Sequence, residues 1–205
     1  MSVHVALIRH GQTDWNRAQR MQGRTDIPLN ETGRQQAREL AEQLAAGDEW
    51  HAVVTSPLLR ASGTAEIIAK RLGIEVVLPC HDLIERSFGD AEGLSPTTAL
   101  TRWPTREYPG MEGHGAVAQR GQRALNAIDA RFSGKRVLAV SHGSFMRHLL
   151  AHIAGTQVAD MPRLENATVS EVSATDDGSW HIRSIAGAPF VPPATRPAAE
   201  LDLSG

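Results

Sequence analysis

Two histidines stand where buried strands are expected to end, and each is followed by a glycine. One is His10, behind the apolar run 3–8, and the other is His142, behind the apolar run 136–140. In open α/β sheets ligands bind beyond the carboxyl ends of the strands, so neighbouring parallel strands bring such side chains to one pocket. An imidazole with an unprotonated ring nitrogen can attack phosphorus when a hydrogen bond holds its other nitrogen. The two positions therefore predict a shared site for chemistry on a phosphate group.

Two arginines are expected to supply the positive charge that this chemistry needs. Arg9 adjoins His10 and can donate paired N–H bonds to phosphate oxygens. Arg60 falls in the first turn of a helix that is expected to have Ser56 as its N-cap and Pro57 as its first residue. A helix dipole disfavours a cation there by up to about 1 kcal/mol, and a bound anion would reverse that penalty. An arginine whose stem packs on the surface is the alternative interpretation.

His142, Gly143 and Glu85 would complete the site. The His142 ring can join the positive cradle around a phosphoryl group, and Gly143 opens a helix whose free N–H groups favour anions. Cleavage of an alkyl phosphate also needs a proton for the leaving oxygen, and a carboxyl group is the usual donor. Glu85 is the candidate, because the two apolar residues before it can partly bury it. The plainer alternatives are a helix-capping histidine and a solvated loop glutamate.

The elements that must position these residues alternate between strand and helix, which is typical of a mostly parallel sheet covered by helices. Strands are expected at 3–8, 51–55, 74–78 and 136–140, with a hairpin of 168–173 and 180–185 around an Asp-Gly turn. Helices are expected at 32–45, with a capping box of Thr32 and Gln35, and at 57–72, 117–132 and 144–153. Periodicity fails over 80–115, which predicts a long functional loop with short helical pieces.

Composition limits the class of protein. With 205 residues and 41% hydrophobic side chains, the chain is expected to form one domain over 1–186, followed by a weakly ordered Pro/Ala-rich tail over 187–205. The balance of 21 basic against 23 acidic residues argues against nucleic acid or a membrane as partner. No signal peptide or membrane span is expected, and the lone Cys80 fits a reducing compartment, so the cytoplasm is the expected location.

Four short motifs resemble those of the histidine phosphatase superfamily, the phosphoglycerate mutase-like group, and they occur in the family's order. The motifs are LIRHGQTDWN at 7–16, SPLLRA at 56–61, ERSFGDAEG at 85–93 and SHG at 141–143. The resemblance implies an α/β fold, a three-layer α/β/α sandwich with a mostly parallel central sheet. This agrees with the order of strands and helices that the hydrophobic pattern predicts.

The resemblance also implies a role for each candidate residue. His10 becomes phosphorylated, Arg9, Arg60 and His142 hold the phosphoryl group, and Glu85 gives a proton and later takes one. It also implies substrate-binding roles for Asn16, Gln22 and Gly23. Gly143, discussed above, is expected to bind the substrate with them. Neither a metal nor an organic cofactor is implied.

The resemblance leaves the acceptor of the phosphoryl group open. Water takes it from His10 in a phosphatase, and a phosphoglycerate takes it in a cofactor-dependent phosphoglycerate mutase primed by 2,3-bisphosphoglycerate. Such mutases carry a long insertion before the second histidine, whereas Glu85 and His142 are only 57 positions apart. We therefore expect a phosphomonoester hydrolase acting on a small phosphorylated metabolite, with the mutase as the alternative. A phospholigand-binding protein without catalysis is a further alternative.

The substrate loop departs from the family pattern. Family phosphatases commonly carry a Gly-Gly-Glu-Ser stretch, where this chain has GMEGHG at 110–115. Loop side chains that can contact a substrate, or simply pack, are Arg102, Trp103, Arg106, Tyr108 and His114. His148 and His152 have the spacing of metal ligands on a helix, but no further ligand is evident, so no metal site is expected. The oligomeric state, a homodimer included, is left open.

Overall fold

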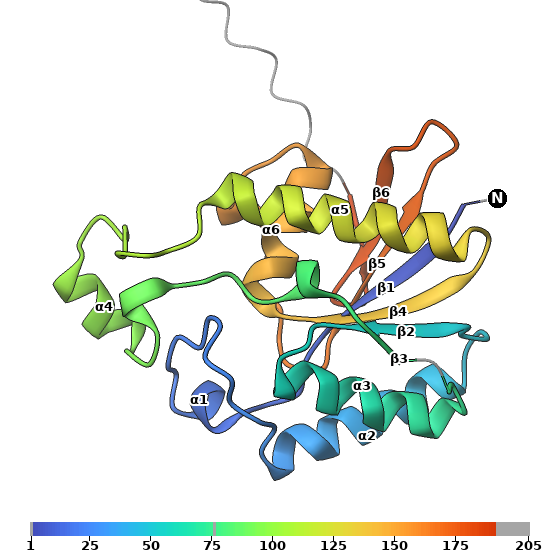
Figure 1. Cartoon of the computed structure of the whole chain (residues 1–205), viewed down its shortest axis with the longest axis horizontal. Coiled ribbons are helices and arrows are strands. Elements are labelled where there is room, and N and C mark those ends of the chain that lie inside the picture. Colours follow the sequence, from blue (N-terminus) through green and yellow to red (C-terminus); the bar gives the residue numbers. More distant parts are fainter. Residues whose placement is uncertain (1, 76, 192–205) are drawn as a thin grey trace, which may run out of the picture.

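A mixed sheet forms the centre of the computed structural model, which describes residues 2–75 and 77–191 (Figure 1). Its seven strands lie in the order β3-β2-β4-β1-β5-β6-β7. They are β1 (His4–Arg9), β2 (Ala52–Thr55), β3 (Val77–Pro79), β4 (Arg136–Ser141), β5 (Val169–Ala174), β6 (Trp180–Ile185) and β7 (Ala188–Pro189). Strands β3, β2, β4 and β1 run parallel, whereas β5, β6 and β7 pair antiparallel with their neighbours. The expected mostly parallel sheet and the expected hairpin are both confirmed.

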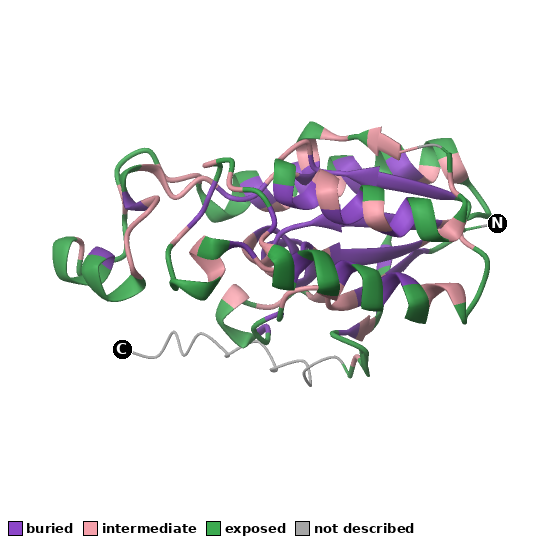
Figure 2. Cartoon of the chain, turned by 90° about the horizontal axis from the view of Figure 1, so that it is seen from below, coloured by how far each residue is buried: buried purple, intermediate pink, exposed green. Residues whose placement is uncertain are grey.

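Helices cover both faces of this sheet. Helices α5 (His114–Phe132) and α6 (Gly143–Ala154) lie on one face, and α2 (Glu31–Ala45) and α3 (Leu59–Leu72) lie on the other (Figure 1). Alternate residues of β1 enter the two cores, because successive side chains of a strand point to opposite faces. Figure 2 shows the buried strands between helices whose outer faces are exposed. The expected α/β/α sandwich is therefore confirmed.

The register of β1 and β4 decides where the two histidines meet. These strands are parallel neighbours, with Arg9 opposite Ser141. The His10 N–H donates to the Ser141 carbonyl oxygen at 3.0 Å. His10 and His142 thus leave adjacent strands at the same level of the sheet, as the sequence pattern predicts.

The start of α2 differs from the expected one. The predicted capping box of Thr32 and Gln35 is wrong, because both residues lie inside the helix and Asn30 is the N-cap. The Asn30 side chain accepts from the Gly33 N–H at 2.9 Å. Gly33 in turn lies against the loop after β1, where a Cβ on Gly11 would meet the Gly33 carbonyl oxygen at 2.3 Å. Glycine at position 11 therefore allows α2 to approach the loop that carries His10.

The start of α3 is also shifted. The prediction that Ser56 caps this helix and Pro57 opens it is wrong, because the helix begins at Leu59. Asp26, from a distant loop, supplies the cap instead, and its carboxylate accepts from the Leu59 N–H at 2.7 Å. The Ser56 hydroxyl accepts from the Leu58 N–H at 3.3 Å and also contacts the site.

The long loop contains the short helical pieces that were expected. They are η1 (His81–Leu83), η2 (Gly89–Ala91) and α4 (Pro96–Arg102), with α1 (Asp14–Arg17) and η3 (Val158–Asp160) in other connections. Helix α4 lies away from the sheet, at one end of the molecule (Figure 1). Of the expected tail over 187–205, residues 188 and 189 pair with β6, and residues 192–205 lie outside the described part. No helix within the described residues is long and apolar enough to cross a membrane.

Candidate active site

His10 is buried and held in one tautomer. Its side chain Nδ1 lies 2.7 Å from the Gly11 carbonyl oxygen. A carbonyl oxygen only accepts, so Nδ1 carries the proton and Nε2 keeps its lone pair. Burial, together with the charges of Arg60 and Arg9, holds the pKa of His10 well below 6.5. The ring is therefore neutral at neutral pH, which is the state that can act as a nucleophile.

Backbone carbonyls, and not carboxylates, hold the two arginines beside His10. Arg9 Nη1 donates to the Leu164 carbonyl oxygen. Arg60 is fully buried, and its Nη1 and Nη2 donate to the carbonyl oxygens of Thr25 and Gly23 at 2.9 and 2.7 Å. The Nε atoms of both arginines are buried without a hydrogen-bond partner among the described residues. The carbonyls fix both guanidinium groups and leave their charge and their remaining N–H donors, the Nε–H included, for an anion.

His142 lies next to His10 and close to the charge of Arg60. It is fully buried, and its ring centroid lies 5.1 Å from that of His10. Its Nε2 shares a 2.7 Å hydrogen bond with Ser56 Oγ, and its Nδ1 is buried without a partner in the described part of the chain. Burial, with the charge of Arg60 and the nearby His10, holds the pKa of His142 well below 6.5. The Ser56 hydroxyl therefore orients this ring, a contact that sequence reasoning missed.

Glu85 is 7% exposed, so the expected partial burial is confirmed. Its Oε1 accepts from the backbone N–H groups of Arg86 at 2.8 Å and Phe145 at 2.7 Å. Its Oε2 accepts from the Ser144 N–H at 3.1 Å. The N–H groups at the start of α6 were expected to be free for a phosphate. For the N–H groups of Ser144 and Phe145 that prediction is wrong, because both donate to Glu85. The helix N-terminus instead anchors the carboxylate of the expected proton donor.

A cavity of about 1030 Å³ opens over these groups. The expected site residues that line it are Arg9, His10, Asn16, Gln22, Gly23, Arg60, Glu85 and Gly143. The Thr13 hydroxyl contacts two of them, because its Oγ1 lies 2.9 Å from Gln22 Oε1 and 3.1 Å from Asn16 Oδ1. A Cβ on Gly143 would lie 3.1 Å from Arg9 Nε, so glycine leaves room for that side chain. The structure thus brings all the expected residues together, with His142 just behind the wall.

The outer wall of the cavity separates the loop candidates into two groups. Arg106, Tyr108 and His114 line it, whereas Arg102 stacks over the Trp103 ring, with 4.7 Å between guanidinium carbon and ring centroid. These last two are not among the lining residues. Arg102 and Trp103 thus pack on each other, and Tyr108 both lines the cavity and packs against Trp103, with 5.6 Å between ring centroids.

A second histidine pair lies on this wall. His148 also lines the cavity, and its Nε2 lies 2.8 Å from His114 Nδ1. Its own Nδ1 lies 2.7 Å from the Ser144 carbonyl oxygen, so that nitrogen carries the proton. His148 is thus paired with His114 and not with His152. No group of three or more His, Cys, Asp or Glu side chains that could hold a metal ion is found within residues 2–75 and 77–191.

Two further contacts support the loop of His10 and had no signal in the sequence. The Gly11 N–H donates to Thr64 Oγ1 at 3.0 Å, and Asn166 Nδ2 donates to the His10 carbonyl oxygen at 2.9 Å. Both partners come from segments far along the chain, so local patterns do not reveal them.

Comparisons with known proteins agree with this geometry. The sequence is 41% identical over 180 residues to the uncharacterized phosphatase PhoE of Bacillus subtilis, covering 87% of this chain and 92% of that protein. It is 35% identical over 194 residues to a metal-independent phosphoserine phosphatase of Arabidopsis thaliana, covering 89% and 80%. The solved structure of a mycobacterial glucosyl-3-phosphoglycerate phosphatase in complex with VO3 is similar with a TM-score of 0.81 at 28% identity, covering 89% of this chain and 98% of that one.

The relatives include proteins named as mutases beside those named as phosphatases. Together with the shared fold, the phosphatases among them support a phosphomonoesterase. The family model described as histidine phosphatase superfamily (branch 1) matches residues 5–186, which is most of the chain. The protein therefore belongs to the histidine phosphatase superfamily (branch 1).

Proposed function

We propose that the protein hydrolyses phosphate monoesters of small metabolites through a phosphohistidine at His10. One observation carries this proposal: a neutral His10 with Nε2 unprotonated lies beside the Nε–H groups of Arg9 and Arg60 and the Nδ1 atom of His142, all buried without a hydrogen-bond partner among the described residues. Phosphoryl transfer depends chiefly on positioning and on neutralising the non-bridging oxygens, and these donors suit both tasks.

In the first step, His10 Nε2 attacks the phosphorus atom. The N–P bond forms as the bond from phosphorus to the ester oxygen breaks, and Glu85 donates a proton to that leaving oxygen. Arg9, Arg60 and His142 hold the three non-bridging oxygens, which spread the transferred charge. Alcohol leaves with the proton, and Glu85 remains as a carboxylate.

In the second step, water hydrolyses the phosphoenzyme. The Glu85 carboxylate takes a proton from water, whose oxygen attacks phosphorus while the N–P bond breaks. Inorganic phosphate leaves, His10 regains its lone pair, and Glu85 is protonated for the next cycle. Asn16, Gln22, Gly23 and Gly143 contribute the surrounding walls that bind the substrate.

Catalysis in this proposal needs no metal, because guanidinium groups supply the charge that a cation would otherwise supply. A relative named metal-independent phosphoserine phosphatase supports this part of the proposal. The nearly balanced charge of the chain supports a small ester, and not nucleic acid, as the partner. The lone free thiol of Cys80 supports a reducing compartment, for which we propose the cytoplasm. A homodimer is likewise a proposal, and light scattering coupled to size exclusion tests it.

The test of the mechanism compares wild type with His10→Ala and Glu85→Gln. We expect wild type to form an acid-labile phosphoenzyme, and His10→Ala to form none and to lose turnover while circular dichroism shows an intact fold. Glu85→Gln should slow alkyl phosphates, with their poor leaving groups, far more than p-nitrophenyl phosphate, which needs little protonation. A folded and active His10→Ala variant contradicts the mechanism. Tight binding of phosphate esters without turnover by wild type would identify a binding protein instead.

The mutase alternative is supported by the relatives that carry that name. Phosphorus NMR of 3-phosphoglycerate with catalytic 2,3-bisphosphoglycerate separates the two outcomes in one spectrum. Growth of 2-phosphoglycerate, absent with His10→Ala, would establish the mutase and make the bisphosphate its primer. Orthophosphate alone would support the phosphatase.

A further inference from the structure

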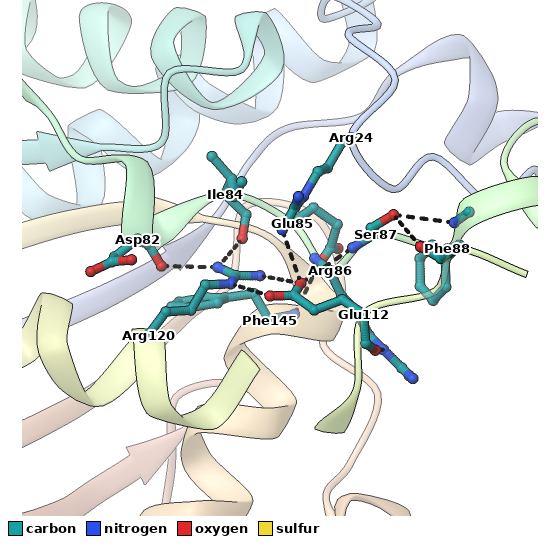
Figure 3. A network of polar contacts seen from close by, with 12 residues as sticks. Arg24, Asp82, Ile84, Glu85, Arg86, Ser87, Phe88, Glu112, Arg120 and Phe145 are labelled. Carbon is teal, nitrogen blue, oxygen red and sulfur yellow. Dashed lines mark hydrogen bonds and ion pairs between the residues drawn. The ribbon is translucent and has the colours of Figure 1, made fainter. Parts of the chain in front are cut away.

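An ion pair between the buried Arg120 and the partly buried Glu112, outside the cavity, holds the segment that carries Glu85 (Figure 3). Arg120, on α5, is 5% exposed, and Glu112 lies just before that helix. Arg120 Nε and Nη2 donate to the two carboxylate oxygens of Glu112 at 2.8 and 3.0 Å. This is the forked, two-bond geometry that fixes both partners in one orientation.

The remaining nitrogen of Arg120 holds the chain that leads into Glu85. Its Nη1 donates to the carbonyl oxygens of Asp82 at 2.9 Å and Ile84 at 2.6 Å. The guanidinium carbon also lies 4.9 Å from the ring centroid of Phe145, whose backbone N–H donates to Glu85 Oε1 (Figure 3). One guanidinium group therefore contacts both the backbone before Glu85 and the residue that binds its carboxylate.

Glu112 holds the chain on the other side of Glu85. Its backbone N–H donates to the Ser87 carbonyl oxygen at 3.0 Å, and its carbonyl oxygen accepts from Arg86 Nε at 2.8 Å. Its carboxylate also forms an ion pair with Arg24 Nη2 at 3.3 Å, which ties in the loop whose carbonyls hold Arg60. The segments before and after Glu85 thus meet at one ion pair (Figure 3).

Such a pair is expected to contribute little to the free energy of unfolding, because the desolvation of two charges costs about as much as their mutual attraction contributes. Burial opposes the negative charge of Glu112, yet the hydrogen bond and charge of Arg120, with Arg24, hold the pKa of Glu112 below its usual value. Glu112 is therefore charged at neutral pH, and its carboxylate accepts both hydrogen bonds from the Arg120 guanidinium. Proton transfer, by contrast, depends steeply on the placement of the donor.

We propose that the Glu112–Arg120 ion pair positions Glu85 for proton transfer to the leaving group. The pair acts through the backbone on both sides of Glu85 and touches no reacting atom, so its members are positioning residues. The proposal rests on the proposed role of Glu85. Loss of the fork should leave phosphate binding intact and make protonation of poor leaving groups inefficient.

The test measures kcat/KM for β-glycerophosphate and for p-nitrophenyl phosphate in Glu112→Gln and Arg120→Lys, at a temperature where circular dichroism shows every variant folded. Glutamine keeps the shape of Glu112, and lysine keeps the charge of Arg120. We expect about a tenfold loss with the alkyl ester and less than about a threefold loss with the aryl ester. The matched control is the exposed fork of Arg71 and Glu42, with bonds of 2.7 and 2.8 Å, where Glu42→Gln and Arg71→Lys should change neither value.

A double variant separates positioning of Glu85 from a merely structural role. In a Glu85→Gln background the proton donor is already gone, so Glu112→Gln should leave the alkyl-to-aryl ratio unchanged. Equal losses with both esters, unchanged rates in both single variants, or a further change of the ratio in that background would each overturn the proposal. Failure of the proposed function has a different signature, because wild type itself would then hydrolyse neither ester.

Discussion

Gly143→Ala should lower activity and leave stability nearly unchanged, because the added methyl group would crowd the side chain of Arg9. A Cβ at this position would lie 3.1 Å from Arg9 Nε and 3.4 Å from Arg9 Cδ and Cζ, tighter than ordinary van der Waals contact. The Arg9 guanidinium cannot swing away freely, since its Nη1 is bonded to the Leu164 carbonyl oxygen. Arg9 must therefore shift by a few tenths of an ångström from the place where it holds the phosphoryl group.

The size of the effect follows from that shift. Misplacement of a positioning group by about 1 Å can cost about a hundredfold in rate, so a smaller shift should cost about tenfold, or about 1.4 kcal/mol in activation free energy. The free energy of unfolding should change by less than about 1 kcal/mol, because alanine favours the helix by about 0.5–1 kcal/mol and offsets the crowding. A change of that size moves Tm by less than about 4 °C in a domain of this length.

The assay measures kcat/KM with p-nitrophenyl phosphate and Tm by circular dichroism. Gly115→Ala is the matched control, because Gly115 also lies in the first turn of a helix and a Cβ there meets nothing within 4 Å. The control should keep full activity and should gain slightly in Tm. Full activity in Gly143→Ala, or an equal loss in both variants, would refute the reasoning about Arg9.

Two further predictions concern pH. Burial and the charges of Arg60 and Arg9 hold the pKa of His10 well below 6.5, so its Nε2 gains a proton, and the nucleophile is lost, only when pH falls through that lowered value. The acid limb of kcat/KM for p-nitrophenyl phosphate should therefore lie well below pH 6.5, and a limb at 6.5 or above from His10 would contradict the site geometry. Burial, opposed by the Ser144 carbonyl and helped by Arg86, lowers the pKa of His148 from 6.5 to about 4. Between these values the unfolded chain binds a proton that the folded chain does not, so stability falls as pH drops through this window, by up to about 1.4 kcal/mol per pH unit. His148→Gln should make Tm less dependent on pH over that range, and a Tm profile parallel to that of wild type would exclude this role.

Local patterns of apolar residues predicted much of the fold, because they indicate which residues of a segment are buried. The apolar runs before His10 and His142 mark strands buried on both faces, and such strands pair in parallel sheets. Helix starts were less predictable. At α3 the cap comes from Asp26, far from Leu59 in sequence, so no nearby residue reveals it.

The sequence by itself determined which side chains could act on a phosphate group and at which end of the sheet they lie. His10, Arg9 and His142 follow from strand ends, because a strand that is buried along its length can present polar residues only where it emerges. Tertiary structure alone decided how each group is held. Glu85 is bound by the N-terminus of α6, His142 by Ser56, and the chain around Glu85 by a salt bridge from α5. Contacts of this kind join segments far apart in sequence, and their partners are chosen by the packing of helices on the sheet, which no local pattern of residues encodes.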